Sequence, residues 1–419
     1  MSKFVIEKKG KLEGNVAVGG CKNAILPILA ATLLTEEKCV INAVPPLSDV
    51  IALCSMIKEM GIFLDIDQKK QCVSVCAKNI ESIQTDYQKA AKMRASFLIM
   101  GALLARCREA IIPLPGGCPI GSRPVDLHLK GFYALGCHSE QSHGFIHICA
   151  KKLQGDKIYL DFPSVGATEN IMIAATLAKG VTTILNAAAE PEVIDLAEFL
   201  KKMGANITGE GTSTITITGV KKLSGTEYTV MPDRIEAGTF MIAAAITKGD
   251  VVVENVREKD LKPILAKLSE TNVKTQKVEE NAFRVYTNTK LQPVSLKTMP
   301  FPGFPTDMQA PFMSLLSVIK GTSVITETVF ENRFLHATEL QRMGAKISID
   351  SRSAVIEGVE KLTGTQVKAM DLRGGAGLIL SALAAEGKTE ISDIYHIERG
   401  YYNIEKKLQK IGASIVKMT

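Results

Sequence analysis

An internal repeat of about 70 residues limits the folds that are open to this chain. In each repeat a helical segment ends at a turn residue, and an apolar strand follows. The turn residue is glycine or asparagine, the two residues that most readily adopt the left-handed conformation of a helix C-cap. It occurs six times, at Gly61, Gly136, Gly204, Asn272, Gly344 and Gly412. This spacing predicts six copies of one structural unit.

Each repeat also contains an earlier helical segment that is apolar on nearly every side, as in residues 171–180, 239–249 and 378–387. Such helices are typical of a buried position, whereas the second helix, as in residues 193–203, is amphipathic. We therefore expect the order strand, helix, strand, helix, strand, strand in each repeat. The predicted fold is α/β, with three repeats in each of two domains and buried apolar helices surrounded by sheets.

Length and composition restrict the function. A chain of 419 residues is long enough for two domains, and a net charge of +6 suits small anionic ligands without requiring a polyanion. Aromatic residues make up 5% and tryptophan is absent, which argues against stacking platforms for nucleic acid. The sequence has neither an apolar run of membrane-spanning length nor an N-terminal signal peptide. We expect a cytoplasmic protein without membrane or nucleic-acid partners.

Cys118 stands apart from the other cysteines. All nine cysteines lie in the first 149 residues without a C-x-x-C pair, so neither a disulfide framework nor a zinc site is expected. Most are expected to be small buried residues. Cys118, however, lies in a Gly- and Pro-rich loop at residues 113–128, and Arg123, Asp126 and His128 follow it. An accessible thiolate near positive charge is typical of a reactive cysteine, whereas composition alone favours one more buried thiol.

Polar or charged clusters come just before the buried helices. Because free N–H groups and the helix dipole attract anions, these helix starts are candidate sites for anionic substrates. The clusters lie at residues 20–23, 92–96, 163–168, 232–236, 305–309 and 371–375. Glu190 and Glu192 are interpreted as loop or cap groups.

Together these motifs resemble the enolpyruvyl transferase family, and within it the UDP-N-acetylglucosamine 1-carboxyvinyltransferases. The resemblance runs from Lys22 to the C-terminus and rests on the motifs GGCKNA, PGGCPIGSRPVD, PSVGATEN, PDRIEAGT, FENRF and DLRGG. It implies two inside-out α/β barrels, one formed by residues 22–230 and the other by residues 1–21 with 231–419. It also implies transfer of enolpyruvate from phosphoenolpyruvate to the 3′-hydroxyl of UDP-N-acetylglucosamine, with release of phosphate. This is the first committed step of peptidoglycan synthesis.

The resemblance also implies roles for individual residues. The family forms a covalent adduct with phosphoenolpyruvate at the position of Cys118, which fits a proton donor to C3. Asp307 fits the base for the sugar hydroxyl, and Lys22, Arg123 and Arg399 fit a clamp for phosphoenolpyruvate. The catalytic set is therefore Cys118, Asp307, Lys22 and Arg399. The substrate-binding set is Lys22, Asn23, Arg94, Arg123, Pro124, Val125, Asp126, Leu127, Pro163, Ser164, Val165, Gly166, Asp307, Val329, Arg333, Asp371, Arg373 and Arg399.

Simpler interpretations exist for several of these residues. Asp307 also fits an ordinary helix N-cap, residues 164–166 a helix-entry turn, and any one Lys or Arg a solvated surface charge. Phe162 departs from the family, since some members have Lys there, which puts one nucleotide contact in doubt. We expect no metal and no organic cofactor, because the substrate brings its own leaving group, and a monomer or weak homo-oligomer.

Three other functions remain as alternatives. A shikimate 3-phosphate enolpyruvyl transferase shares the fold and reaction but lacks a cysteine loop of this kind. An RNA-terminal phosphate cyclase requires a nucleotidylated histidine and a basic face, which six histidines and the small net charge do not favour. A silent binding paralogue is expected to have lost Cys118 or Asp307, and both are present.

Overall fold

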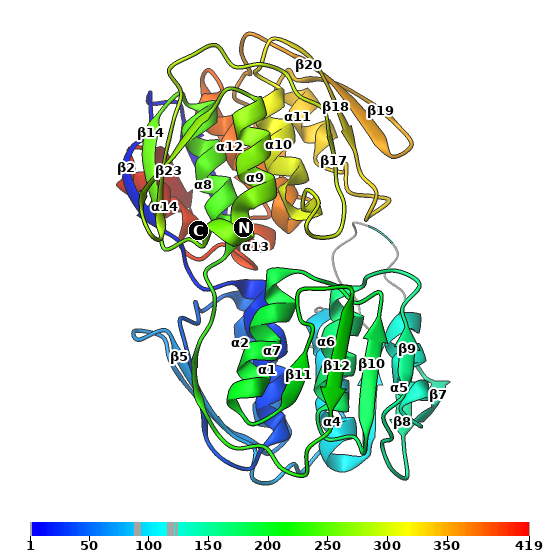
Figure 1. Cartoon of the computed structure of the whole chain (residues 1–419). Coiled ribbons are helices and arrows are strands. Elements are labelled where there is room, and N and C mark those ends of the chain that lie inside the picture. Colours follow the sequence, from blue (N-terminus) through cyan, green and yellow to red (C-terminus); the bar gives the residue numbers. More distant parts are fainter. Residues whose placement is uncertain (1, 88–93, 115–120, 122–124, 419) are drawn as a thin grey trace. The chain divides into compact units, whose positions relative to one another are not determined.

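The computed structural model describes residues 2–87, 94–114, 121 and 125–418. These form two compact units (Figure 1). The N-terminal unit contains the described residues of 20–114 and 125–231, and the C-terminal unit contains residues 2–19, Gly121 and residues 232–418. The N-terminal unit is thus made from the middle of the chain, and the C-terminal unit from both of its ends.

The C-terminal unit contains three four-stranded sheets. Its strands are β1 (Lys3–Glu7), β2 (Glu13–Ala17), β14 (Asp250–Glu254), β15 (Lys274–Glu279), β16 (Ala282–Tyr286), β17 (Leu296–Lys297), β18 (Gly321–Thr326), β19 (Lys346–Asp350), β20 (Ser353–Gly358), β21 (Gln366–Lys368), β22 (Lys388–Ser392) and β23 (Ser414–Met418). The strand orders are β21-β22-β1-β23, β15-β16-β14-β2 and β17-β18-β20-β19. The helices are α8 (Arg234–Ile246), α9 (Glu258–Glu270), η3 (Thr306–Met308), α10 (Gln309–Leu316), α11 (Ala337–Arg342), α12 (Leu372–Ala384), α13 (Tyr395–Glu398) and α14 (Ile404–Lys410).

The N-terminal unit also has three sheets in its described part. Its strands are β3 (Cys39–Asn42), β4 (Phe63–Asp67), β5 (Cys72–Cys76), β6 (Glu109–Pro113), β7 (His138–Ser142), β8 (Phe145–Cys149), β9 (Lys157–Tyr159), β10 (Val181–Leu185), β11 (Asn206–Thr208), β12 (Thr214–Thr218) and β13 (Glu227–Thr229). The strand orders are β11-β12-β10-β9, β13-β3-β5-β4 and β6-β8-β7. The helices are α1 (Lys22–Ala31), η1 (Thr32–Leu34), α2 (Ser48–Glu59), η2 (Arg94–Leu98), α4 (Ile99–Cys107), α5 (Asp126–Ala134), α6 (Val165–Ala175) and α7 (Pro191–Lys202).

The six sheets confirm the predicted repeat. In the fifth repeat, β17, α10, β18, α11, β19 and β20 follow one another, and the sheet joins a parallel pair, β17 and β18, to an antiparallel hairpin. A buried helix connects the two parallel strands, as parallel pairing requires. The predicted turn residues all have positive φ, between 66° at Asn272 and 106° at Gly204. Each of the six sites therefore has the left-handed C-cap that its residue type predicted.

Two strands are exchanged between repeats that are far apart in the sequence. β2 precedes α1 but pairs in parallel with β14, with Val16 opposite Val253. β13 precedes α8 but pairs in parallel with β3, with Tyr228 opposite Ile41. The first strand of the first repeat therefore completes a sheet of the C-terminal unit, and the first strand of the fourth repeat completes a sheet of the N-terminal unit.

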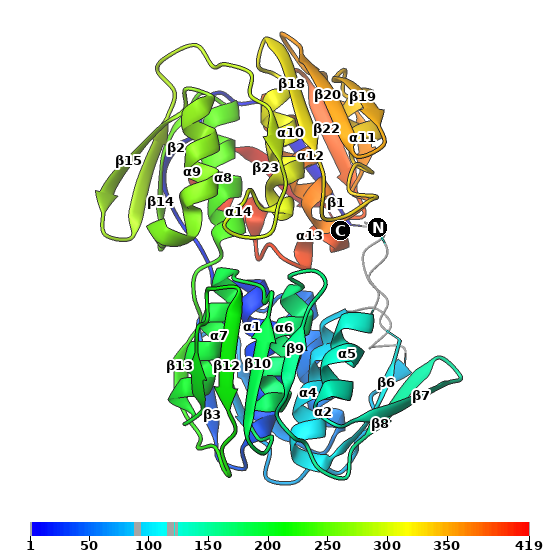
Figure 2. The ribbon, with the colours of Figure 1, turned by 45° about the vertical axis from the view of Figure 1, so that its right-hand side comes forward.

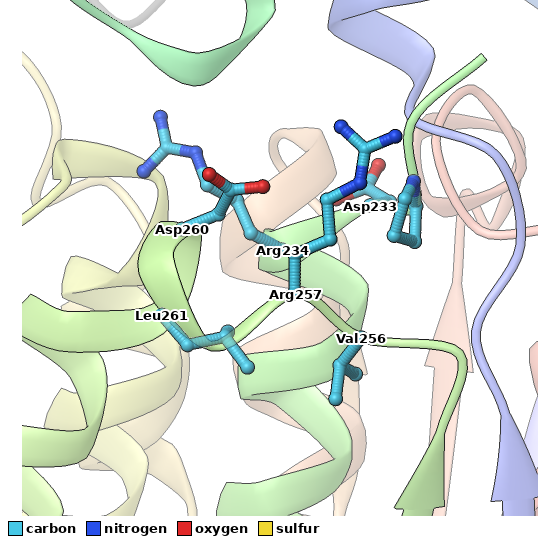
Figure 3. Close-up of a pocket in the computed structure, with 7 residues that line it drawn as sticks. Asp233, Arg234, Val256, Arg257, Asp260 and Leu261 are labelled. Atoms are coloured by element: carbon cyan, nitrogen blue, oxygen red, sulfur yellow. The ribbon is translucent and has the colours of Figure 1, made fainter. Parts of the chain in front are cut away.

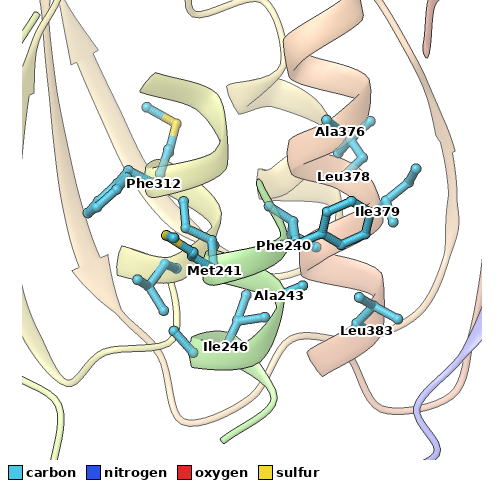
Figure 4. Packing of buried hydrophobic residues seen from close by; sticks show 14 of the residues in the cluster. Phe240, Met241, Ala243, Ile246, Phe312, Ala376, Leu378, Ile379 and Leu383 are labelled. Atoms are coloured by element: carbon cyan, nitrogen blue, oxygen red, sulfur yellow. The ribbon is translucent and has the colours of Figure 1, made fainter. Parts of the chain in front are cut away.

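The buried helices form the core of each unit. In the C-terminal unit α8, α10 and α12 pack against one another, with Phe240, Phe312 and Leu378 among the side chains between them (Figure 4). All residues of α8 are buried, which explains why its sequence lacks a polar face. In the N-terminal unit α1, α4 and α6 pack in the same way. Sheets lie around these helices in both units (Figures 1 and 2), as predicted.

No helix in the described part of the chain is both long and apolar enough to cross a membrane. The eight cysteines that the structure describes are all free thiols. Four of them, including Cys21 and Cys39, are buried, and the other four are half-buried.

Candidate functional site

A carboxylate held by two guanidinium groups lies at the starts of α10 and α12 in the C-terminal unit. Asp307, in the short η3 turn before α10, accepts a hydrogen bond from Arg333 Nη2 to Oδ1 at 2.8 Å. Its Oδ2 accepts hydrogen bonds from Arg373 Nε at 3.1 Å and Nη2 at 2.9 Å. Arg373 thus binds through two nitrogens, the geometry in which arginine recognises carboxylates best. The structure brings together three of the predicted site residues here.

The two guanidinium groups determine the protonation state of Asp307. Burial by itself would raise the pKa of Asp307, but the positive charges of Arg373 and Arg333 and their hydrogen bonds outweigh it and lower the pKa well below its usual range. Both arginine side chains are almost fully buried, whereas about a quarter of the Asp307 side chain is exposed, at 24%. In this arrangement Asp307 is ionised and is a weak base, because two cations stabilise its charged form.

Asp371 is the N-cap of α12. Its Oδ1 accepts hydrogen bonds from the backbone N–H groups of Arg373 and Gly374, both at 2.9 Å. The cap fixes the first turn of α12 and thereby the direction in which Arg373 leaves the helix. The guanidinium of Arg373 also lies over the ring of Tyr401, with 5.3 Å between the guanidinium carbon and the ring centroid. Asp371 therefore supports Arg373 through the backbone.

Arg399 follows α13 and is half-buried. The next residue, Gly400, leaves no room for a side chain, because an added Cβ would lie 2.8 Å from the Leu372 side chain in the first turn of α12. Burial lowers the pKa of His396, and the charge of Arg399 lowers it further, whereas Asp371 opposes this. Arg399 therefore belongs to the same charged region as Asp371.

A buried histidine lies behind this cluster. His336 is almost fully buried beside the first turn of α12, where a Cβ added at Gly374 would lie 2.8 Å from its own Cβ. Burial lowers the pKa of His336 to about 4, the charge of Arg333 adds to this, and Asp371 opposes it. The imidazole is therefore neutral at pH 7.

In the N-terminal unit, Lys22 is the first residue of α1. Its Nζ lies 2.7 Å from Asp49 Oδ2, and both side chains are 8% exposed. This ion pair holds a nearly buried ammonium group, which carries three N–H donors, at the start of α1. The neighbouring Asn23 is exposed.

The predicted nucleotide-binding segments of the N-terminal unit adjoin one another. Ser164 caps α6 by accepting a hydrogen bond from the Ala167 N–H at 3.3 Å, and Val165 and Gly166 begin the helix. A Cβ added at Gly166 would lie 3.4 Å from the His128 ring in the first turn of α5. Val125, Asp126 and Leu127 form the start of that helix. The structure therefore brings two of the predicted segments together, and Pro163 precedes the cap.

Asn170 connects these segments to the start of α4. Its Nδ2 lies 3.1 Å from His128 Nδ1 and donates to the Phe97 carbonyl at 2.9 Å. Its Oδ1 accepts a hydrogen bond from the Gly101 N–H at 2.9 Å. One buried amide therefore joins α5, α6 and the η2–α4 segment, where Arg94 is the first residue of η2. His128, the last residue of the Gly- and Pro-rich segment at residues 113–128, is hydrogen-bonded to Asn170.

Glu169 forms a carboxyl cluster with Glu190 and Glu192. Burial raises the pKa of Glu169 well above its usual value, and the negative charges of Glu192 and Glu190 raise it further. Glu192 is 2% exposed, and its Oε1 accepts a hydrogen bond from the Cys21 thiol at 3.8 Å. The interpretation of Glu192 as a loop or cap group is therefore wrong, since its side chain is buried in a helix against the start of α1.

Three predicted residues, Cys118, Arg123 and Pro124, lie outside the described residues. A small pocket at the starts of α8 and α9 is lined by described residues that include Pro232, Asp233 and Arg234 of the predicted cluster at residues 232–236, but no member of the catalytic or substrate-binding sets (Figure 3). One of those residues, Asp233, caps α8 by accepting hydrogen bonds from the N–H groups of Ile235 at 2.8 Å and Glu236 at 3.0 Å. The described members of the catalytic and substrate-binding sets lie in the charged clusters described above and do not line this pocket.

Comparison with known proteins assigns the family. Residues 6–408 match the sequence profile of a family described as EPSP synthase (3-phosphoshikimate 1-carboxyvinyltransferase). UDP-N-acetylglucosamine 1-carboxyvinyltransferase 1 of Caldanaerobacter subterraneus subsp. tengcongensis is 55% identical over 416 residues, which cover 99% of each chain. UDP-N-acetylglucosamine 1-carboxyvinyltransferase 2 of Carboxydothermus hydrogenoformans is 54% identical over 100% of both chains. The chain belongs to the UDP-N-acetylglucosamine 1-carboxyvinyltransferase family.

Solved structures show that the fold of this carboxyvinyltransferase family member extends to more distant proteins. The enolpyruvyl transferase NikO from Streptomyces tendae is similar with a TM-score of 0.90 and 24% identity, covering 100% of this chain and 99% of the other. An EPSP synthase from Acinetobacter baumannii is similar with a TM-score of 0.76 and 19% identity over 100% of both chains. At these identities the likeness establishes the fold, two α/β domains, and not the substrate.

Several residues of the clusters were not predicted. Asp49 and Asn170 are buried partners of predicted residues, yet an Asp or Asn in a helix carries no signal of its own in a single sequence. His336 lies three residues after Arg333 in the same segment, whereas Tyr401 reaches Arg373 from another segment. Asn170 lies at the end of the PSVGATEN motif, so the motif itself was the signal that could have found it.

Proposed function

We propose that this protein transfers the enolpyruvyl group of phosphoenolpyruvate to the 3′-hydroxyl of UDP-N-acetylglucosamine and releases phosphate, the first committed step of peptidoglycan synthesis. The observation that carries this proposal is 50–55% identity, over essentially the full length, to proteins named UDP-N-acetylglucosamine 1-carboxyvinyltransferase. The shikimate 3-phosphate alternative has less support, because the EPSP synthase structures are only 19% identical to this chain.

The proposed chemistry is addition followed by elimination. The 3′-hydroxyl oxygen bonds to C2 of phosphoenolpyruvate, while Asp307 takes the hydroxyl proton and the Cys118 thiol gives a proton to C3. The bond between C2 and the phosphate oxygen then breaks as a proton leaves C3, which restores the double bond. Lys22, Arg123 and Arg399 hold the carboxylate and phosphate of phosphoenolpyruvate.

The ion pairs of the C-terminal unit add a condition to this mechanism. Because Arg333 and Arg373 lower the pKa of Asp307, its carboxylate is a poor proton acceptor while both remain bound. We infer that substrate binding draws at least one guanidinium away, which restores the basicity of Asp307 and frees a cation for the substrate. Asp371 keeps Arg373 at the start of α12 throughout.

The remaining substrate-binding roles follow the predicted assignment. Asn23, Arg94, Asp126 and Leu127 contact the sugar nucleotide, and backbone N–H groups of residues 164–166 hold its diphosphate. Val329 and Arg333 complete the acceptor site. We propose a cytoplasmic monomer or weak homo-oligomer that requires no metal or organic cofactor and acts on small molecules alone.

Phosphate release is the direct test of this function. The protein is incubated with phosphoenolpyruvate and either UDP-N-acetylglucosamine or shikimate 3-phosphate, and free phosphate is measured over time. We expect release with UDP-N-acetylglucosamine only. Release that depends on shikimate 3-phosphate instead would establish the alternative function.

The role of Cys118 is tested by Cys118→Ala. We expect this variant to lose turnover and to resist alkylation by the epoxide phosphonate fosfomycin, because both need the thiolate. Cys76→Ala, at a half-buried thiol of β5, is the control and should retain both properties. Activity and the mass of the protein after treatment are measured, and full activity of Cys118→Ala would refute the assigned role.

A further inference from the structure

A buried carboxyl group outside the predicted site organises the two loops that carry Asp307 and Arg333. Glu327 follows directly after β18 and is 1% exposed. Its Oε1 accepts hydrogen bonds from the Thr298 hydroxyl at 2.8 Å and from the N–H groups of Val329 at 2.8 Å and Phe330 at 3.1 Å. Its Oε2 accepts a hydrogen bond from the Thr306 hydroxyl at 2.8 Å.

These donors come from two separate loops. Residues 298–306 follow β17 and end next to Asp307, whereas residues 327–333 follow β18 and end at Arg333. Because β17 and β18 are parallel neighbours, both loops leave the same edge of the sheet. Thr298 and Thr328 hold the starts of the loops together, since the Thr328 hydroxyl donates to the Thr298 carbonyl at 2.6 Å.

Glu327 therefore binds residues next to both partners of the Asp307–Arg333 ion pair. On one loop it holds Thr306, the residue before Asp307. On the other it holds Phe330, whose ring lies under the Arg333 guanidinium at 5.3 Å from ring centroid to guanidinium carbon. The ion pair joins the far ends of the two loops, and Glu327, at the start of one loop, bonds both Thr298 and Thr306 of the other. These contacts fix one loop relative to the other.

We propose that Glu327 is a positioning residue for acceptor-substrate recognition, which sets the relative placement of Asp307, Val329 and Arg333. The proposal rests on the proposed function, in which these residues meet the sugar nucleotide. Every hydrogen bond described for Glu327 has its carboxyl group as the acceptor. An ionised carboxyl group only accepts, and no neutral side chain of the same shape matches four donors on two oxygens.

Glu327→Gln is the decisive variant. Glutamine keeps the size of the side chain but replaces one oxygen with an NH₂ group, which then faces a donor and leaves it without an acceptor. The loop attached through that oxygen shifts, and a shift of about 1 Å lowers the rate by as much as about 100-fold. We expect kcat/KM for UDP-N-acetylglucosamine to fall by about 10- to 100-fold. The KM for phosphoenolpyruvate, which Lys22 and Arg399 bind, should stay within about twofold.

Thr306 supplies a second, milder test. Thr306→Val removes the hydroxyl that bonds Glu327 Oε2 and should reproduce the effect in the same direction. Thr306→Ser keeps the hydroxyl and should restore activity to within about twofold of the parent. The control for loss of a buried carboxylate is Glu339→Gln, because Glu339 Oε2 accepts the Lys368 N–H at 2.8 Å, in another part of the same unit.

The outcomes separate this proposal from the proposed function. If the parent protein releases no phosphate with UDP-N-acetylglucosamine, the proposed function fails, and amide hydrogen exchange at Val329 and Phe330 then decides the role of Glu327. Faster exchange at these amides in Glu327→Gln than in Glu339→Gln supports the proposal. In an active parent, unchanged kinetics in Glu327→Gln, or equal changes in the KM values of both substrates, would overturn it. The proposal would also be overturned if Thr306→Ser were no more active than Thr306→Val.

Discussion

Both units place charged residues at the helix starts of the same repeating unit, but they neutralise those charges differently. In the N-terminal unit one ammonium group, Lys22, meets one carboxylate, Asp49. In the C-terminal unit two guanidinium groups, Arg333 and Arg373, share the single carboxylate of Asp307. The repeat thus determines where a helix begins, whereas a few side chains at that position determine the charge and the basicity of the local site.

The two units also differ in how these helices are capped. The helix α12 has a side-chain cap, Asp371, whose carboxylate satisfies two of the first N–H groups. The helix α1 has no side-chain cap, because its N-cap residue is Cys21. The first turn of α1 therefore has no capping side chain beside Lys22, whereas the cap of α12 fixes Arg373.

The largest difference is expected between Asp307→Asn and Asp49→Asn. Asp307→Asn removes the proposed base and leaves two buried guanidinium groups without their carboxylate, so kcat should fall by about 10²- to 10⁴-fold. Asp49→Asn removes a carboxylate that pairs with Lys22 and leaves the proposed base in place, so kcat should change by no more than about tenfold and the KM for phosphoenolpyruvate should fall. Steady-state kinetics of both variants measure this. Equal losses of kcat would show that the two clusters contribute alike.

A smaller effect is expected from Arg333→Gln, which removes one of the two cations that lower the pKa of Asp307. The pKa of Asp307 should rise, so its basic form should be lost at higher pH than in the parent protein. The activity of Arg333→Gln should therefore decline more steeply than that of the parent between about pH 6 and pH 4. The control is Arg342→Gln, at an arginine with 59% of its side chain exposed. Parallel pH profiles for Arg333→Gln and the parent would contradict this account of Asp307.

The smallest expected effect is on the free energy of unfolding and comes from Glu169 in the N-terminal unit. The pKa of Glu169 is raised in the folded protein, so above about pH 4.3 the folded state holds a proton that the unfolded state has lost. The free energy of unfolding should therefore fall as pH rises, by up to about 1.4 kcal/mol per pH unit until the folded pKa is reached. Glu169→Gln cannot titrate and should remove this slope.

Urea unfolding between about pH 5 and pH 8 measures the effect of Glu169→Gln. The variant should gain stability relative to the parent as pH rises. Glu140→Gln, at an exposed residue of β7, controls for the loss of one carboxyl group. If the parent and Glu169→Gln show the same pH slope, Glu169 does not carry the extra proton.

Features that repeat were predictable from the sequence, because each copy supports the others. The turn residues from Gly61 to Gly412 predicted six left-handed caps, and the apolar segments predicted the buried helices α6, α8 and α12. Cap residues such as Ser164 and Asp371 were predictable as members of a helix start, since their chemistry acts within a few residues.

Features that join different repeats were not predictable in the same way. The spacing of the repeats does not reveal that β2 and β13 pair with strands of distant repeats, because the sequence of a strand does not show which strand it pairs with. Asp49 and Glu327 act on residues in other segments, and an isolated acidic residue has no pattern that reveals its partner. The family motifs predicted Asp307, Arg333 and Arg373 as site residues, but not that two guanidinium groups bind one carboxylate.

The position of β1 has a consequence for how the protein is made. β1 lies between β22 and β23, with Lys3 opposite Met418, so this sheet needs residues 3–7 as well as residues 388–392 and 414–418. The N-terminal unit needs nothing beyond Met231. We expect it to assemble during synthesis before the C-terminal unit, because β1 cannot pair with β22 and β23 until residues 388–418 have been made.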